Sequence, residues 1–560
     1  HACVYNGIEV IFMEKKYLGF KEDLQTEFKS DKKCLGDEDI IEAVVAFANT
    51  KGGKLYIGVE DDGEITGLHK KHKDSTQLAA FIANRTIPTI SSRVEMFENG
   101  KDYLIISVPE SRSVIATSSG KIMRRRIKID GTPENIPMYP FEIPSRLSDL
   151  SLLDYSAQPV PECKYTDLDD VERQRLRNVI NSYNGEKQLL ELNNEELDKA
   201  LQLVKEINGE LVPTFAGLIL IGKERSIKRL MPTVAASFQV IQNTEVKVND
   251  IFTLPLIASI EKIFNYMEAW NHEEEFQIGL FRVPLPEFDK RAFREAVVNA
   301  FCHRDYTLLG RVRVTIDDEG LTIANPGGFI EGIEIDNLLT AEPHGRNPVL
   351  ADALKRIGLA ERTGRGIDRI FEGSLLYGKA LPDYSESDSR KVTLFISRSS
   401  PNRAFVKMIA DEQNRTGQIM SVNRLLVLYT IEKFSRVNTA MLSEEAKLSE
   451  SRVKSIVEKL VEDGLVEAVG SGKNREYILS GKVYKNMDKS INYTRQTDID
   501  KVRYPELVLK LAREKGKITR NDVAELLHLT PSQAYRILKK MNDKLEPIGH
   551  GRGAGYIIKK

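Results

Sequence analysis

The sequence predicts a multidomain α+β protein, and three observations support that fold class. The chain has 560 residues, which is too many for one hydrophobic core. Strand-like and helix-like patterns alternate from residue 8 to residue 398. The remainder, residues 403–560, is mainly helical and falls into two similar halves that each end in a hairpin pattern. We therefore expect several domains, of which the last two are related in structure.

Composition places the chain among globular proteins. Hydrophobic residues make up 41% and charged residues 29% of the chain, which are ordinary values for that class. No apolar run approaches the roughly 20 residues that cross a bilayer, and no cleavable signal peptide is recognisable. The four cysteines lack paired spacing, which argues against a disulfide framework or a zinc knuckle. These features predict a cytoplasmic protein with no membrane partner.

Charge is distributed unevenly along the chain, although the net charge is only −1. Residues 403–560 hold 30 lysines and arginines against 20 aspartates and glutamates, whereas the rest of the chain holds 51 against 62. A basic tail on an acidic body is typical of a protein whose tail binds a polyanion. A solvated lysine-rich surface would give the same balance, so charge alone leaves both interpretations open.

The first segment combines helix and strand patterns. DEDIIEAVVAFANT (37–50) has an acidic start and helical spacing of its apolar residues, which predicts an amphipathic helix. GGKLYIGVEDDGEITGL (52–68) predicts two strands joined at an Asp-Gly pair, a strong hairpin signal. YLIISVPES (103–111) predicts another strand, and the proline-rich stretch 133–144 predicts a domain boundary.

The second segment begins with helix patterns rich in Glu and Leu (168–208). TFAGLILIG (214–222) is a short continuous apolar run and predicts a buried strand. RVRVTIDDEGLTIANPGGF (311–329) alternates on both arms and predicts a hairpin. Between these lies REAVVNAFCHRDY (294–306), which has the apolar spacing of a helix.

This last stretch carries an unusual polar row. On a helix, Glu295, Asn299 and His303 fall at i, i+4 and i+8 along a stripe separate from the apolar residues. A carboxylate can take a proton from water, and an amide oxygen can ligate a hard cation such as Mg²⁺. The alternative is that Glu295 caps a loop and Asn299 bonds to the backbone.

Two glycine turns follow the polar row. NPGGF (325–329) comes after a strand, and RTGRGIDRI (362–370) leads into a helix whose N-terminus suits an anion. Glycine lets the backbone approach phosphates closely. Each turn alone is ordinary, but the ordered set of acidic helix, strand, glycine turn and second glycine turn favours a nucleotide site.

This order resembles the GHKL, or Bergerat-fold, ATP-binding domains of histidine kinases, gyrase and MutL. More closely, REAVVNAFCHRDY, IANPGGF and GRNPVLADALKRIGLAERTGRGI are similar to the family of RecG-like C-terminal domains, although no Walker motif of a helicase motor is present. The resemblance implies ATP and Mg²⁺ as cofactors, Glu295 as the water-activating catalytic base and Asn299 as the metal ligand. Asn325 stands where the wider superfamily has an Asp that reads the adenine amino group, a departure that bears on adenine specificity.

The resemblance also assigns the glycines and the segment between them. Gly327 and Gly328 would line the adenine and lid side, and Gly364 and Gly366 would approach the phosphates. Residues 340–361 stand where such domains carry a mobile lid. Arg346 would then contact phosphate, or lie on the surface while the lid is open. The implied cofactor-binding set is Asn299, Asp305, Asn325, Gly327, Gly328, Arg346, Gly364 and Gly366.

The first segment is similar to the Schlafen AlbA-type domain in EDLQTEFKS (22–30) and FANTKGGKLYIGVEDDGEITGL (47–68). Some relatives cut RNA with clustered carboxylates, whereas others only bind nucleic acid. The candidate nuclease cluster around a divalent ion is Glu22, Glu27, Asp61 and Asp62. We favour the plainer interpretation, in which Glu27 alternates with a lysine on a strand and the Asp pair serves a turn. The cations of KIMRRRIK (121–128) fit phosphate contacts or a charge-protected edge strand.

The two halves of the tail match each other. Each reads as three helices followed by a two-stranded wing, the order of a winged helix-turn-helix. Ser449 and Thr530 are good N-caps for the third helices, which would enter a DNA major groove. A winged helix used for protein contacts is the alternative, and the basic surplus favours DNA. The candidate nucleic-acid-binding residues are Arg452, Lys454, Lys473, Arg475, Gln533, Arg536 and Arg552.

The predicted domains are an AlbA-type α/β domain (8–145), a Bergerat-like α/β sandwich with a helical lead-in (150–398) and two winged helices (403–485 and 498–560). Together they predict a homo-oligomeric transcriptional regulator or switch that binds double-stranded DNA under the control of ATP, with weak ATPase activity and RNA as a candidate ligand of the first domain. The rival is a nucleic-acid-cleaving defence or RNA-processing enzyme that uses the N-terminal carboxylates. A third hypothesis is an interaction protein with an inactive nucleotide pocket.

Overall fold

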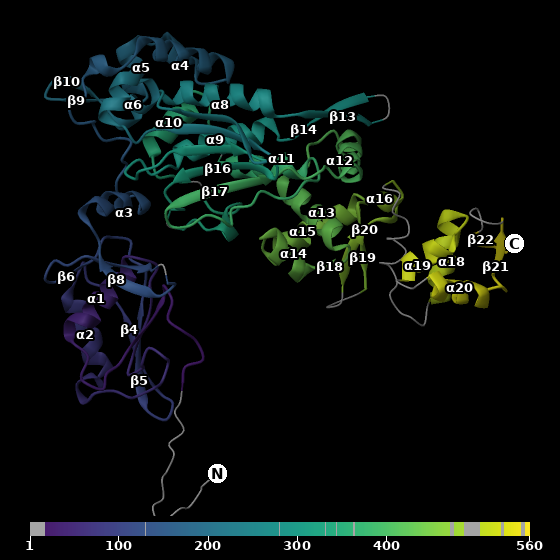
Figure 1. Cartoon of the computed structure of the whole chain (residues 1–560), viewed down its shortest axis with the longest axis horizontal. Coiled ribbons are helices and arrows are strands. Elements are labelled where there is room, and N and C mark those ends of the chain that lie inside the picture. The colour runs from purple at the N-terminus through teal and green to yellow at the C-terminus, as the bar shows by residue number, and fades with distance from the viewer. Residues whose placement is uncertain are drawn as a thin grey trace, which may run out of the picture. The chain divides into compact units, whose positions relative to one another are not determined.

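The computed structural model describes residues 17–128, 130–278, 281–330, 332–342, 344–361, 364–470, 475–486, 504–527, 531–549 and 555–559. The chain forms two compact units, His1–Tyr155 and Ser156–Lys560 (Figure 1). The multidomain α+β class predicted from the sequence is confirmed. Among the described residues, none of the helices combines the length and the apolar character needed to cross a membrane.

The first unit is built on a four-stranded sheet in the order β1-β2-β5-β4, in which β1 and β2 are parallel and the other pairs antiparallel. One sheet face packs on α1 and α2, and Phe47, Leu55 and Leu104 lie in the core between them (Figure 1). The helix predicted at 37–50 is confirmed as α1; its three leading acidic residues suit a helix N-terminus. The elements are β1 (Thr26–Lys29), α1 (Asp37–Ala48), β2 (Gly53–Ile57), α2 (Ser75–Arg85), β3 (Thr86–Ile87), β4 (Arg93–Glu98), β5 (Asp102–Val108), β6 (Ala116–Thr117), β7 (Met123–Ile127), β8 (Pro133–Pro137) and α3 (Ile143–Asp149).

The hairpin predicted at 52–68 forms in part. Its Asp-Gly turn is present, since the Gly63 N–H donates to the Glu60 carbonyl at 2.8 Å. Val59 and Ile65 form an isolated antiparallel bridge across this turn, whereas the strand β2 itself pairs with β1 and β5. The proline-rich stretch 133–144, predicted as a domain boundary, forms β8 against β7 and leads into α3, and the first compact unit ends at Tyr155. The strand β2 takes its partner strands from distant parts of the sequence, which a local turn signal does not reveal.

The second unit begins with a helical lead-in, in which one sequence prediction also fails. The run 214–222 is not a strand but the helix α6, capped by the Thr214 side chain, which accepts the Gly217 N–H at 3.2 Å. A short apolar run that is buried on all sides has no periodicity to distinguish a strand from a helix. The lead-in elements are α4 (Asp170–Ser182), α5 (Asn194–Ala200), β9 (Val204–Ile207), β10 (Glu210–Pro213), α6 (Phe215–Ile221) and α7 (Glu224–Leu230).

A five-stranded sheet in the order β12-β11-β15-β16-β17 follows, with helices on one face (Figure 1). The hairpin predicted at 311–329 is confirmed as β15 and β16, and Val312, Val314 and Ile316 alternate into the core. The elements of this sheet domain are β11 (Ala236–Gln242), β12 (Glu245–Phe252), α8 (Leu256–Trp270), β13 (Glu273–Ile278), β14 (Phe281–Pro286), α9 (Lys290–Cys302), β15 (Val312–Ile316), β16 (Gly320–Pro326), α10 (Pro348–Arg356), α11 (Gly366–Leu375) and β17 (Lys391–Ser397).

The tail contains two successions of three helices and a hairpin, the order expected of winged helices. We call residues 422–479 the first tail domain and residues 504–558 the second tail domain. The core of the first takes in Leu375 of α11, whereas the second has a core of its own. The tail elements are α12 (Arg403–Thr416), α13 (Val422–Phe434), β18 (Val437–Asn438), α14 (Thr439–Ala446), α15 (Glu450–Glu462), β19 (Val466–Val469), β20 (Glu476–Leu479), α16 (Gly481–Asn486), α18 (Tyr504–Lys515), α19 (Arg520–Leu527), α20 (Pro531–Lys540), β21 (Leu545–Ile548) and β22 (Gly555–Ile558).

Candidate nucleotide site

Helix α9 carries the predicted catalytic and metal-binding residues. It starts at Asp289, whose carboxylate accepts the N–H groups of Arg291 and Ala292 at 3.0 and 2.8 Å, as a helix N-cap requires. Glu295 is only 2% exposed. Asn299 is half-buried one turn further on, and its side chain makes no hydrogen bond to any described residue. The amide therefore remains available for a ligand, whereas the carboxylate is enclosed.

Glu295 lies against the first residue of α11. A methyl group added at Gly366 would collide with the Glu295 carboxylate, so glycine is required for this close approach. Burial raises the pKa of Glu295, although Arg369, Arg294 and the backbone N–H of Glu361 favour its charged form. A carboxylate with a raised pKa beside the start of a helix is a suitable general base.

The predicted residues Asp305 and Arg346 form a buried ion pair. Their side chains are each 2% exposed, and Arg346 Nη1 lies 3.0 Å from Asp305 Oδ2. Arg346 Nη2 also donates to the Gly328 carbonyl at 3.1 Å. Thr307 donates its N–H and hydroxyl to Asp305 at 2.8 and 2.6 Å. Arg346 is therefore neither a phosphate-facing lid residue nor a surface arginine, because its charge is used to join two loops inside the domain.

The first glycine turn also packs on the protein itself. Gly327 has a φ of +96°, and a Cβ there would lie 2.7 Å from the Asp305 Cβ. A Cβ at Gly328 would lie 2.6 Å from the Asp388 carbonyl oxygen. A side chain would not fit at either glycine, and their place on the adenine and lid side stays a prediction. Asn325 is 5% exposed and donates to the Pro326 carbonyl at 3.2 Å.

The segment predicted as a mobile lid is largely part of the core. Asn347 is 1% exposed, and its Nδ2 donates to the carbonyls of Cys302 and Arg304, both at 2.8 Å, which ties the segment to the end of α9. In α10, Leu350 and Leu354 are completely buried. The lid prediction fails because α10 supplies apolar residues to the sheet domain.

The second glycine turn keeps a position suited to phosphate. Gly364 is exposed with a φ of +75°, and Gly366 opens α11 two residues later. Residues 362 and 363 lie outside the described part of the chain. The predicted site residues thus fall into two groups. One group, Glu295, Asn299 and Gly366, lies along α9 and the start of α11. The other contains the buried ion pair of Asp305 and Arg346.

Sequence reasoning missed the burial of the residues that follow α9. Arg304 is completely buried and donates to the carbonyls of Thr233 and Gly310 at 2.7 and 2.8 Å. Burial lowers the pKa of His303 to about 4, and the nearby charge of Arg346 acts in the same direction, so the imidazole is neutral at pH 7. In the sequence, the run of polar residues in HRDY (303–306) was the only signal that these side chains bond within the domain interior.

The N-terminal carboxylates converge only in part. Burial is the main cause of the raised pKa of Glu22, and the negative charges of Glu27 and Asp61 raise it further. These three carboxylates therefore lie near one another. Glu27 is neutralised by an ion pair with Arg125 and by Lys29 at 2.8 Å. Among the described residues, no group of three or more carboxylate, histidine or cysteine side chains is placed to hold a metal ion.

Asp62 and the three arginines of β7 make contacts within the domain. Asp62 accepts the Glu64 N–H at 2.9 Å, as expected for a turn. The three arginines of β7 are each paired with a carboxylate, so the phosphate contacts considered for KIMRRRIK are not supported. The pairs are Arg124 with Glu142, Arg125 with Glu27 and Arg126 with Glu134.

The tail candidates lie mostly on exposed surface. Arg452 and Lys454 are exposed on α15, and Arg536 is exposed on α20. Ser449 occupies the N-cap of α15 without a capping bond from its side chain. Arg475 lies over the ring of its neighbour Tyr477, with 5.4 Å between the guanidinium carbon and the ring centroid. Thr530, Lys473, Arg552 and the side chain of Gln533 lie outside the described residues.

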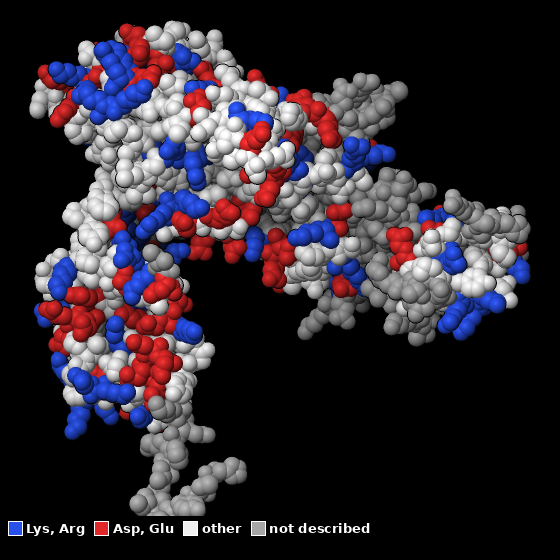
Figure 2. Space-filling view, in the orientation of Figure 1, with Lys and Arg blue, Asp and Glu red and all other residues white. Residues whose placement is uncertain are grey.

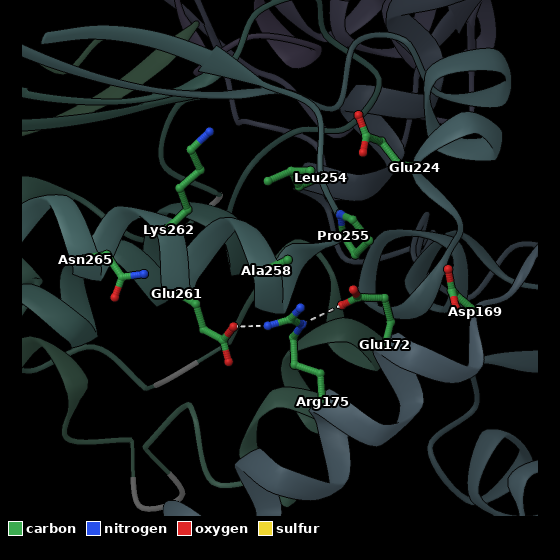
Figure 3. Close-up of a pocket in the computed structure, with 10 residues that line it drawn as sticks. All are labelled: Asp169, Glu172, Arg175, Glu224, Leu254, Pro255, Ala258, Glu261, Lys262 and Asn265. Atoms are coloured by element: carbon green, nitrogen blue, oxygen red, sulfur yellow. Dashed lines mark hydrogen bonds and ion pairs between the residues drawn. The ribbon is translucent and has the colours of Figure 1, made fainter.

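A cleft of about 420 Å³ lies between α4, α7 and α8, away from these groups (Figure 3). Arg175 occupies its floor between two carboxylates, with Nε 3.0 Å from Glu172 and Nη1 paired to Glu261. Because Arg175 already pairs with a carboxylate on each side, the cleft holds an ionic contact between α4 and α8 and is not a candidate for the nucleotide site.

Three family models match separate parts of the chain. Residues 14–130 match the family described as "Schlafen, AlbA_2", residues 146–237 match "Domain of unknown function (DUF8451)", and residues 310–396 match "Putative ATP-dependent DNA helicase recG C-terminal". The chain therefore combines a segment similar to the Schlafen AlbA_2 family with a segment similar to the RecG C-terminal family. Both resemblances stated from the sequence are confirmed. The match to the RecG C-terminal family begins at residue 310, after α9, so Glu295 and Asn299 lie outside it.

No curated protein matches the chain. Among solved structures, the chain is similar to the crystal structure of the DIP2311 protein from Corynebacterium diphtheriae, with 19% sequence identity and a TM-score of 0.51. The similarity covers 83% of this chain and 94% of that one. At this identity the likeness demonstrates a shared fold.

Proposed function

We propose that this chain is a cytoplasmic, homo-oligomeric regulator that binds double-stranded DNA under the control of ATP. One observation carries the proposal. Helix α11 begins against Glu295, at the glycine turn suited to phosphate, and ends at Leu375 in the core of the first tail domain. A ligand that changes the position of this helix at one end therefore acts on the tail at the other.

The residues along α9 and α11 fit a magnesium nucleotide. The Asn299 amide oxygen would ligate Mg²⁺, and the backbone from Gly364 to Gly366 would approach the phosphates at the start of a ten-residue helix. Bound ATP with Mg²⁺ supplies the differential affinity needed to shift a two-state equilibrium. Glu295 would hold the proton taken from water if the nucleotide is hydrolysed, and its raised pKa supports that role.

The DNA part of the proposal rests on the tail. Both tail domains have three helices followed by a hairpin, and residues 403–560 carry the basic surplus. Cations on such a fold bind phosphates, with a steep dependence on salt. Domains of the GHKL type often pair when nucleotide is bound, which supports a homo-oligomer whose copies present their tails together.

Calorimetry of the full chain with ATP and Mg²⁺ tests the nucleotide site. We expect the wild type to bind, Asn299→Ala to lose most of its magnesium-dependent affinity, and Glu295→Gln to bind without hydrolysis. Asn178→Ala, on an exposed face of α4, is the matched control and should bind like the wild type. The proposal fails if the wild type has no affinity for ATP, or if ATP leaves both DNA affinity and oligomeric state, measured by light scattering, unchanged.

A nuclease is the second candidate, because Glu22, Glu27 and Asp61 lie within electrostatic reach of one another. The pairing of Glu27 with Arg125 speaks against it, since a metal would have to displace a buried guanidinium. We expect the purified protein to leave RNA and single-stranded DNA intact with Mg²⁺ or Mn²⁺. Cleavage that disappears in Glu22→Gln would favour the nuclease instead.

A further inference from the structure

The third helices of the two tail domains differ in charge. Helix α15 (Glu450–Glu462) has three acidic and three basic residues, whereas α20 (Pro531–Lys540) has three basic residues and no acidic one. In a winged helix, this third helix is the one that enters the major groove. Only α20 therefore presents a net positive charge to a polyanion.

The charges are also used differently. On α15, Lys454 lies 3.4 Å from Glu450 and Lys459 lies 3.2 Å from Glu462, so two of its three cations are paired. The three cations of α20 are exposed and make no ion pair with any described residue. Tyr535 is 45% exposed beside them, and Figure 2 shows lysine and arginine side chains gathered over this helix. The cations of α20 are Arg536, Lys539 and Lys540.

The first tail domain is docked to the sheet domain. Leu375 belongs to its core, and Phe371 and Leu339 pack against that core from α11 and from the segment before α10. Lys447, in the turn that leads into α15, lies 3.0 Å from Asp336 of the same segment. A duplex placed on the start of α15 would meet this exposed acidic segment, and repulsion between phosphates and carboxylates would oppose it.

We propose that duplex DNA docks on the α20 face of the second tail domain, through Arg536, Lys539, Lys540 and the neighbouring Tyr535. The first tail domain is a docked module that transmits changes from α11, and its α15 does not contact DNA. This inference rests on the proposed function, since it names the surface through which the regulator binds DNA. It departs from the sequence prediction that both winged helices bind alike.

Two triple variants of the full chain test this assignment. One replaces Arg536, Lys539 and Lys540 by glutamine, and the other replaces the three cations of α15, so each removes three positive charges. The full chain is required because the core of the first tail domain includes Leu375. The probe is a fluorescent random-sequence duplex of about 30 base pairs, followed by anisotropy over a salt series.

We expect the α20 variant to lose at least about tenfold in affinity at low salt and its salt slope to flatten by about one unit for each lost phosphate contact. The α15 variant should stay within about twofold of the wild type. Unchanged thermal melting of both variants will exclude unfolding as the cause.

An affinity loss confined to the α15 variant would overturn the assignment, as would equal losses in both. Wild-type affinity in both variants would also overturn it while leaving the regulator proposal intact. A wild-type chain that binds no duplex at low salt would refute both together.

Discussion

Replacing Arg346 by methionine should destabilise the sheet domain strongly. Its guanidinium and the Asp305 carboxylate are each 2% exposed and 3.0 Å apart. The substitution would remove the positive charge that lies against Asp305 and the bond from Arg346 to the Gly328 carbonyl, while the two bonds from Thr307 to Asp305 would remain. Removing one partner of a buried pair costs about 3–5 kcal/mol. With a urea dependence of roughly 1–3 kcal/mol per molar, the unfolding midpoint should fall by about 1–5 M.

The single tryptophan provides the assay. Trp270 is the last residue of α8 and lies in the sheet domain, so its fluorescence during urea unfolding reports on that domain. Arg365→Met is the matched control, because this arginine is 58% exposed and lies 3.4 Å from Asp368. A surface pair of this kind is worth about 0–1 kcal/mol.

A double variant separates loss of charge balance from loss of packing. Combining Asp305→Asn with Arg346→Met removes both charges, and the free energy of unfolding should recover by about half of the single loss. The reasoning is refuted if Arg346→Met loses no more stability than Arg365→Met, because Arg346 would then be a surface arginine as first predicted from the sequence.

Three further predictions concern burial. Burial raises the folded-state pKa of Glu295 above its unfolded value, so the folded protein loses stability as pH rises through that pKa. At about pH 8, Glu295→Gln should therefore unfold at a higher urea concentration than the wild type. The difference between the two unfolding midpoints should shrink as the pH is lowered. Cys163 and Cys302 are buried, with pKa values raised to about 12, so mass spectrometry after brief iodoacetamide treatment should find half-exposed Cys34 alkylated before either of them; equal labelling of these three cysteines would contradict the burial of Cys163 and Cys302. Gly373→Ala should destabilise the sheet domain by about 1–3 kcal/mol, because the new methyl group would lie 2.5 Å from the Cβ of Ala292 in α9. Urea unfolding followed by Trp270 fluorescence checks this, and an unchanged unfolding midpoint would exclude the tight contact between α9 and α11.

Local signals in the sequence determined several elements correctly. The acidic start and apolar spacing after Gly36 predicted α1, and alternation over 311–329 predicted the β15–β16 hairpin. The order of three helices and a hairpin appeared in both halves of the tail. The two family resemblances also rested on motifs that are contiguous in the chain. Each of these depends on residues within one or two elements, where periodicity and turn chemistry act directly.

Only the tertiary structure decided how the charged and apolar residues are used. Arg346 looked like a phosphate ligand in the sequence, but its partner Asp305 lies 41 positions away, and burial of both makes the pair internal. The apolar run 214–222 forms a helix capped by Thr214, and its burial left no periodicity in the sequence that distinguishes a helix from a strand. The link from α11 to the first tail domain likewise has no local signature, since Leu375 meets that core only after folding. Pairings between distant residues depend on the packing of the whole domain, which no local pattern encodes.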